Sequence, residues 1–79
     1  MSNTTRPLRE IVSQIVNDYF HALDGQPAKK LYHLVLKEME LGLFKTVLHH
    51  SKGNQSKAAE CLGLARGTLR KKLEEYGLE

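Results

Sequence analysis

At 79 residues and a formal net charge of +3, the chain is long enough for one domain, near the lower limit for an independent hydrophobic core. No apolar run approaches the ~18 residues that a membrane span needs, and the polar residues 1–6 contain no signal-peptide core. The single cysteine, Cys61, excludes an internal disulfide framework and indicates a reducing compartment. These features predict a cytoplasmic protein.

A first amphipathic helix is predicted after a short, flexible polar segment, residues 1–6. Pro7 is tolerated in the first turn of a helix, and Asp24-Gly25-Gln26-Pro27 is typical of a helix end followed by a turn. Between them, apolar residues recur at i, i+3, i+4 and i+7, as one face of a helix requires. These residues are Leu8, Ile11, Val12, Ile15, Val16, Tyr19, Phe20 and Leu23.

The second predicted helix, about residues 28–51, is apolar over well over half of its circumference. A helix that is apolar on most sides must be buried on most sides, and a short monomer has too little other chain to cover it. We therefore predict dimerisation through residues 7–51; a compact monomeric four-helix bundle is the alternative. Gly42 lies inside this helix and indicates a bend or a close helix crossing. The apolar residues are Leu31, Leu34, Val35, Leu36, Met39, Leu41, Leu43, Phe44, Val47 and Leu48.

Residues 52–79 predict two short helices joined by a tight turn, which is a helix-turn-helix motif. Asn54 is a good N-cap for the first helix, and Gly63 supplies a left-handed residue that ends it. Leu64 is placed to fill the corner between the helices. The residues predicted to face inward are Ala58, Ala59, Leu62, Leu69 and Leu73, and Cys61 is expected as a small buried hydrophobe.

Positive charge is concentrated in this motif. Residues 52–72 contain six basic residues and one acidic residue, Glu60, although the whole chain carries only +3. Such segregation is expected of a nucleic-acid surface, with the second helix of the motif in the DNA major groove. A basic run on a short helix can also be a merely solvated face. The glycine turn between two short helices favours the DNA-binding interpretation.

The chain resembles the Fis family (factor for inversion stimulation) of bacterial nucleoid-associated proteins. The resemblance covers essentially everything after residue 5, and its most specific block is Arg66-Gly67-Thr68-Leu69-Arg70-Lys71-Lys72-Leu73 followed by Tyr76-Gly77. Enhancer-binding activators of the nitrogen-regulator type end in a similar motif, but there it follows an ATPase domain that this chain lacks. The other matching stretches are Arg6-Pro7-Leu8-Arg9, Asn17-Asp18-Tyr19-Phe20, Leu23, Gly25-Gln26, Leu31-Tyr32, Leu34-Val35-Leu36, Gly53-Asn54-Gln55 and Ala58-Ala59.

The resemblance implies an all-α fold with four helices per chain, in which the first two helices of two chains intertwine as a homodimer. It implies a DNA-bending protein of transcription regulation and nucleoid organisation, located at the nucleoid and weakly sequence-specific. Two motifs closer together than one DNA turn require the DNA to bend, which favours flexible or A/T-rich centres. The residues expected in the dimer core are Ile15, Tyr19, Leu31, Val35, Leu36, Met39, Leu43 and Val47.

Two kinds of DNA contact are predicted in the motif. Arg66 and Arg70 are four residues apart and share a helix face, so both can reach base edges, with guanine as the commonest specific partner. The residues expected to hold phosphates are Asn54, Ser56, Thr68, Lys71 and Lys72.

The sequence departs from the family pattern at three places. Ala65 stands where the family usually has Asn, which predicts weak direct base discrimination there. Residues 1–6 are too few for the family's N-terminal β-hairpin arm, so contact with a recombinase is not expected. Gly42 stands near the family's kinking proline, so a gentler bend is expected.

No enzymatic activity, cofactor or metal site is predicted. The four histidines include no i, i+4 pair, and the sequence has no Gly-rich phosphate loop, G-x-S-x-G elbow or H-E-x-x-H motif. The alternative from another class is a helical dimerisation or protein-interaction module whose basic face binds an acidic protein partner. A steep salt dependence on duplex DNA distinguishes the DNA-binding protein from this module.

Overall fold

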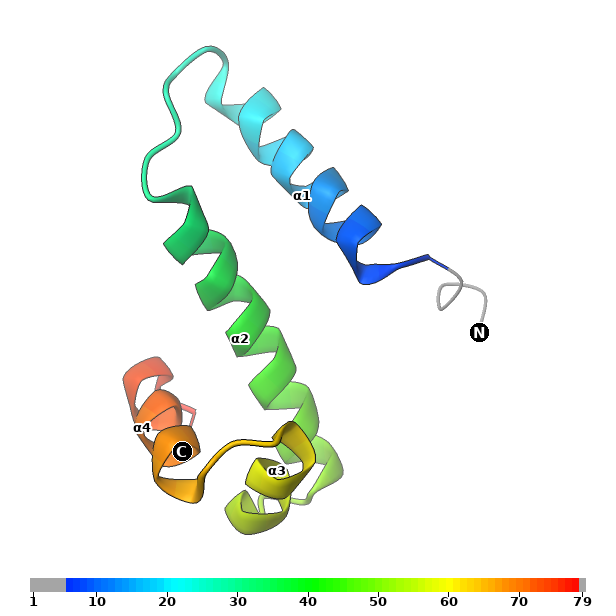
Figure 1. The fold of residues 1–79 in the computed structure, drawn as a ribbon. Helices are drawn as coiled ribbons and strands as arrows, with labels where there is room; N and C mark the ends of the chain where they lie inside the picture. Colours follow the sequence, from blue (N-terminus) through cyan, green and yellow to red (C-terminus); the bar gives the residue numbers. More distant parts are fainter. Residues whose placement is uncertain (1–5, 79) are drawn as a thin grey trace. The chain divides into compact units, whose positions relative to one another are not determined.

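The computed structural model describes residues 6–78, which form α-helices and no strand. The helices are α1 (Leu8–Leu23), α2 (Leu31–His50), α3 (Gln55–Leu62) and α4 (Arg66–Tyr76), shown in Figure 1. The predicted all-α fold with four helices is confirmed. The prediction of a flexible segment at residues 1–6 concerns, apart from Arg6, residues outside the described range. The chain divides into two compact units, residues 1–31 and residues 32–79.

The first unit contains α1, whose ends follow from the sequence signals. Pro7 is the N-cap in an extended conformation, and its carbonyl accepts a hydrogen bond from the N–H of Glu10 at 3.0 Å. Asp24 ends the helix in the left-handed conformation, with φ of 50°, and Gly25 follows at 88°. In the described part of the chain, α1 buries none of its residues; Ile15 remains 57% exposed. The apolar face of α1 is therefore not buried within its own unit.

The second predicted helix begins later than expected, at Leu31 instead of about residue 28, and ends at His50. The cause is local. Lys30 has a φ of 53°, a left-handed conformation that cannot belong to a right-handed helix, and Pro27 disfavours helix at the residue before it. The helix continues through Gly42 without a break, and a Cβ built there would meet no atom of the described chain within 4 Å. The described chain therefore contains no close helix crossing at Gly42.

In the second unit, α2, α3 and α4 enclose a small hydrophobic core. Its buried members are Phe44 from α2, Ala58 and Ala59 from α3, and Leu69 and Leu73 from α4. The inward orientation predicted for both alanines and both leucines is confirmed. Burial of a leucine side chain contributes about 1.5–3 kcal/mol, so these few residues hold the motif against the end of α2. Half-buried Val47, Leu48, Leu62, Leu64, Tyr76 and Leu78 pack around this core.

A second apolar surface of α2 is exposed. Met39 and Leu43 remain 43% and 42% exposed, while Phe44, next in the chain, is buried in the core. Consecutive helical residues point about 100° apart, so one side of α2 packs on the motif and another is left open. No helix among residues 6–78 combines the length and apolar character needed to cross a bilayer.

Candidate nucleic-acid interface

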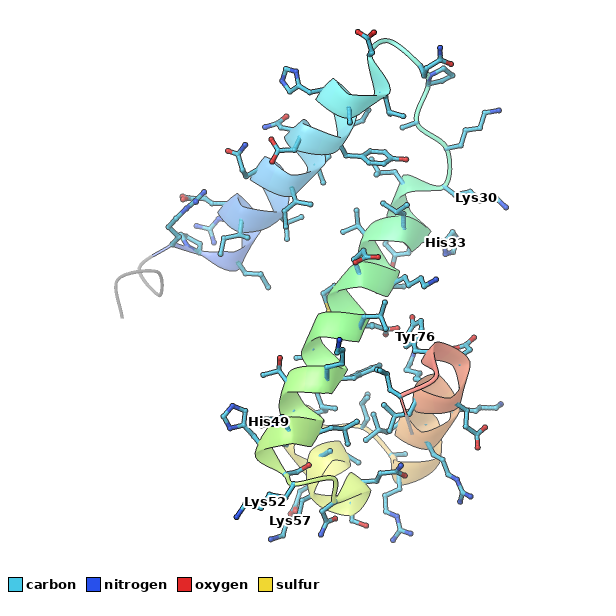
Figure 2. The ribbon with its side chains drawn as sticks, turned by 180° about the vertical axis from the view of Figure 1, so that it is seen from behind. Lys30, His33, His49, Lys52, Lys57 and Tyr76 are labelled. Carbon is cyan, nitrogen blue, oxygen red and sulfur yellow. The ribbon has the colours of Figure 1, made fainter. Side chains whose placement is uncertain are left out.

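A tight turn directs the chain from α2 into α3. Lys52 and Gly53 both take left-handed conformations, with φ of 55° and 80°, and the N–H of Gly53 donates to the Leu48 carbonyl at 2.9 Å. This turn also places basic side chains at one end of the unit, where Lys52 and Lys57 project beside the start of α3 (Figure 2).

Both ends of α3 are capped as predicted. The Asn54 side chain accepts a hydrogen bond from the N–H of Lys57 at 3.0 Å, which satisfies one of the free donors of the first turn. Gly63 has a φ of 74°, and its N–H and that of Leu64 donate back to the carbonyls of Glu60 and Ala59. This pair of bonds is the Schellman arrangement, which ends α3 sharply and turns the chain toward α4.

The exposed side of α4 carries the predicted DNA-contact residues. Arg66, Thr68, Arg70 and Lys71 are exposed, whereas Leu69 and Leu73 face the core. Between α3 and α4 lies a hollow of about 290 Å³, which brings together predicted phosphate and base contacts from both helices. It is lined by Asn54, Gln55, Ser56, Arg66, Gly67 and Arg70. The remaining predicted residues, Thr68, Lys71 and Lys72, line a separate and wider hollow with Glu74 and Glu75.

Arg70 is held only weakly within its own helix. Its Nε lies 3.8 Å from Oε2 of Glu74, one turn further along, and both side chains are more than half exposed. Exposed pairs at this spacing contribute about 0.3–0.5 kcal/mol and are screened by salt. The guanidinium of Arg70 therefore stays available to another acceptor.

Ala65 occupies the N-cap position of α4. Its backbone is extended, with φ of −68° and ψ of 145°, and alanine has no side-chain acceptor for the free N–H groups of the first turn. The first turn of α4 therefore lacks the side-chain cap that Asn54 gives to α3.

Substitution Ala65→Asn is expected to stabilise the protein by about 0.5–2 kcal/mol, because the asparagine side chain can accept a hydrogen bond from a free backbone N–H in the first turn of α4. Thermal and urea unfolding measure the gain. Ala65→Leu is the matched control, since leucine has a similar shape and no acceptor. Equal stability of the Asn and Leu variants would show that the first turn of α4 gains nothing from a cap.

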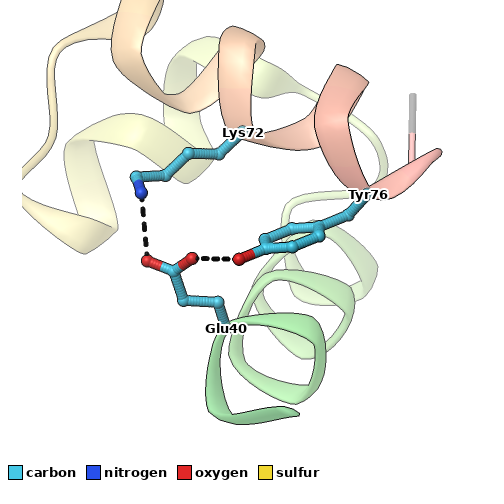
Figure 3. A network of polar contacts seen from close by, with 3 residues as sticks. All are labelled: Glu40, Lys72 and Tyr76. Carbon is cyan, nitrogen blue, oxygen red and sulfur yellow. Dashed lines mark hydrogen bonds and ion pairs between the residues drawn. The ribbon is translucent and has the colours of Figure 1, made fainter. Parts of the chain in front are cut away.

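A partly buried polar cluster, which the sequence patterns did not predict, connects α4 to α2. The Tyr76 hydroxyl donates to Oε1 of Glu40 at 2.6 Å, and Nζ of Lys72 lies 3.2 Å from Oε2 of the same carboxylate (Figure 3). Glu40 is only 9% exposed, and the Tyr76 ring packs beside Phe44 with ring centroids 6.3 Å apart. The signals available in the sequence were the position of Glu40 between the apolar residues Met39 and Leu41 and the i, i+4 spacing of Lys72 and Tyr76.

The cluster changes the acidity of the tyrosine. The hydrogen bond to Glu40, partial desolvation, and the negative charges of Glu40 and Glu75 raise the pKa of Tyr76 to about 12. The folded protein therefore keeps the phenolic proton at pH values where the unfolded chain, with a tyrosine pKa of 10.0, has lost it. The stabilisation is complete below the unfolded pKa and is lost as the pH rises through the folded one.

Wild-type stability is accordingly expected to fall between pH 10 and about 12 more steeply than that of Tyr76→Phe, which has no phenolic proton at this position. The charged groups that face this hydroxyl, Glu40, Lys72 and Glu75, are the same in both proteins. Melting temperatures measured across this range give the difference, and tyrosinate absorbance identifies the late-titrating group. Parallel curves for the two proteins would rule out the hydrogen bond as a source of pH dependence.

The expectation for Cys61 was wrong, because its side chain is exposed. Ala58, Ala59 and Leu62 form the inward side of α3. Cys61 follows Ala59 by two residues, about 200° around the helix, and so points away from the core. Among the residues that the structure describes, no group of His, Cys, Asp or Glu is arranged to hold a metal ion.

Two short helices joined at a left-handed glycine, with basic residues along the exposed side of the second, define a helix-turn-helix protein. A family model described as "Bacterial regulatory protein, Fis family" matches residues 35–76. The chain belongs to the Fis family, which confirms the resemblance found in its motifs.

Individual relatives agree with this membership. A Fis-like DNA-binding protein of Xylella fastidiosa is 58% identical over 72 residues, which cover 91% of this chain and 80% of that protein. The DNA-binding protein Fis of Glaesserella parasuis is 53% identical over 73 residues, covering 92% of this chain and 74% of that protein. The DNA-binding protein Fis of Actinobacillus succinogenes is 51% identical over 75 residues, covering 95% and 76%.

Proposed function

We propose that the protein is a homodimeric DNA-binding and DNA-bending protein of the Fis type, acting at the bacterial nucleoid in transcription regulation and chromosome organisation. The observation that carries this proposal is the hollow between α3 and α4, where Arg66 and Arg70 stand beside the N-terminus of α3. Basic side chains and a helix N-terminus both favour a phosphate backbone at this place. The relatives named above are DNA-binding proteins, and we propose no enzymatic activity or cofactor.

The proposed division of labour separates base contacts from phosphate contacts. Arg66 and Arg70 share one face of α4 and line one hollow, so both can enter a major groove together. Asn54 and Ser56, on the other wall of that hollow, and exposed Thr68 and Lys71 are proposed to hold phosphates and fix the register. Lys72 is not assigned to a phosphate in this proposal, because its ammonium is paired with the carboxylate of Glu40.

Exposed apolar surface supports the homodimer. The side chains of Ile15 in the first unit and of Met39 and Leu43 in the second are each more than two-fifths exposed. Apolar surface left exposed in this way is typical of a protein–protein contact. We propose that a second copy covers these faces, with the α1 and α2 helices of the two chains intertwined. The remaining proposed core residues, Tyr19, Leu31, Val35, Leu36 and Val47, are half-buried in the single chain, which leaves each of them surface to lose in a dimer.

Weak sequence specificity follows from the same features. Ala65 offers no hydrogen bond to a base edge at the start of α4, so direct discrimination rests mainly on the two arginines. The rest is proposed to come from the cost of bending the DNA between two motifs, which depends on the sequence that is deformed. Contact with a recombinase is not proposed.

A salt-titrated binding measurement on duplexes with A/T-rich and G/C-rich centres, with the bend angle recorded, tests this function. We expect affinity to fall steeply with salt: the logarithm of the binding constant should decrease with the logarithm of salt concentration by about 0.9 for each neutralised phosphate. We also expect tighter binding to the duplex with the A/T-rich centre. If the protein binds an acidic polypeptide such as polyglutamate at least as tightly as it binds duplex DNA, it is a protein-interaction module instead. Tight binding without bending would reject the deformation mechanism and keep DNA binding.

A further inference from the structure

Among the described residues of the second unit, Glu40 is the buried carboxylate, and both of its oxygens are engaged by α4. Oε1 accepts the Tyr76 hydroxyl at 2.6 Å, and Oε2 faces the Lys72 ammonium at 3.2 Å. The side chain of Glu40 is 12% exposed, so the ion pair is shielded from solvent and from salt on the carboxylate side. In Figure 3, the side chains of Lys72 and Tyr76 both extend from α4 to this carboxylate on α2.

The ion pair affects which cations of α4 are free to meet DNA. Lys72 follows Thr68 by one helical turn, and the two residues line the same open hollow as Lys71. The Lys72 side chain therefore starts beside two proposed phosphate contacts, yet its ammonium is directed to Glu40. Its side chain is 33% exposed, whereas that of Arg70 is 72% exposed. A count of basic residues in the sequence thus overstates the cations that the recognition helix presents.

We propose that Glu40 is a positioning residue of the recognition helix, which holds the Lys72 ammonium against α2 and thereby keeps it from the DNA phosphates. This inference rests on the proposed function, because it concerns the number of cations that reach a duplex. Glu40 acts through Lys72 and Tyr76 and does not itself touch DNA. The hydroxyl of Tyr76 takes the second oxygen of the carboxylate and so fixes the side chain that Lys72 meets.

A double-mutant cycle on the salt dependence of DNA binding tests the proposal. The four proteins are the wild type, Glu40→Gln, Lys72→Met and the double variant. Glutamine keeps the shape of the side chain and an acceptor for Tyr76 but removes the charge that holds Lys72. Glu40→Gln is expected to steepen the salt slope by about 0.9 for each released ammonium that reaches a phosphate. Lys72→Met and the double variant are expected to keep the wild-type slope.

Lys71→Ala is the matched control, because it removes the neighbouring cation, for which residues 6–78 show no such ion pair. This variant is expected to flatten the salt slope. If Lys72→Met flattens the salt slope as much as Lys71→Ala does, the proposal is overturned, because Lys72 would then contact DNA in the wild type. An unchanged slope in Glu40→Gln would overturn it as well. If circular dichroism shows that Lys72→Met does not fold, the salt slopes of Glu40→Gln and of the double variant are compared instead. These two proteins differ only in the ammonium of Lys72, so equal slopes would overturn the proposal.

The failure of this inference is distinguishable from failure of the proposed function. A wild type without salt-dependent duplex binding rejects both. A wild type that binds duplex DNA with a steep slope, while Glu40→Gln behaves identically, rejects the role of Glu40 alone.

Discussion

Leu43→Asp is expected to abolish the dimer and, with it, most of the folded structure. In the single chain Leu43 is 42% exposed on the side of α2 away from the core. If the protein were a stable monomer, a substitution there would change the free energy of unfolding by roughly 0.5 kcal/mol or less. If a second copy covers this side, the new carboxylate is buried without a partner, which costs several kcal/mol for each chain. The apolar faces of α1 and α2 then lose their cover together.

Sedimentation equilibrium and circular dichroism measure this outcome. The wild type is expected at about twice the 9.0 kDa chain mass at micromolar concentration, with a melting temperature that rises with protein concentration. Lys45→Asp is the matched control. It introduces an aspartate into the same helix, α2, two positions further on and about 200° around the axis from Leu43. Its cost in helix propensity is therefore similar, but the new carboxylate lies outside the proposed dimer interface. A folded monomeric wild type, or equal melting of both variants, would contradict the homodimer.

Arg66→Ala is expected to weaken binding to a preferred duplex by about 1–3 kcal/mol and to relax the base preference at particular positions. Arg66 lies in the first turn of α4 and lines the hollow with Asn54 and Ser56. We propose that the edge of a DNA groove meets the motif at this hollow. Arginine fits guanine through two parallel hydrogen bonds, and alanine leaves the base edge unread. The loss should therefore depend on sequence.

Lys71→Ala provides the contrast, because a phosphate contact carries no base information. Its affinity loss is expected to be even across sequences, with a salt slope lower by about 2 for a symmetric dimer. Competition binding of both variants against a randomised duplex pool, followed by salt titration on one selected duplex, separates the two effects. Matching selection profiles and matching slopes for the two variants would contradict the division between base and phosphate contacts.

Local chemistry explains which parts of the structure could be predicted from the sequence. The cap at Asn54 and the left-handed Gly63 depend on neighbours within five residues along the chain, and both were predicted correctly. The inward positions of Leu69 and Leu73 follow from helical spacing alone, since a residue four further on lies on the same face. The start of α2 was predicted about three residues too early, because periodicity gives no sign of the left-handed conformation at Lys30.

Contacts between distant residues could be decided only by the tertiary structure. Glu40 and Tyr76 are 36 residues apart, and nothing in the local pattern of either one names the other. The sequence by itself determined four helices, a helix-turn-helix at residues 52–79, a segregated positive charge and membership in the Fis family. The fold decided that the ammonium of Lys72 and the hydroxyl of Tyr76, both on α4, meet the carboxylate of Glu40 on α2. The reason is that spacing along one helix fixes the face of a residue, whereas its partner depends on which other helix packs against that face.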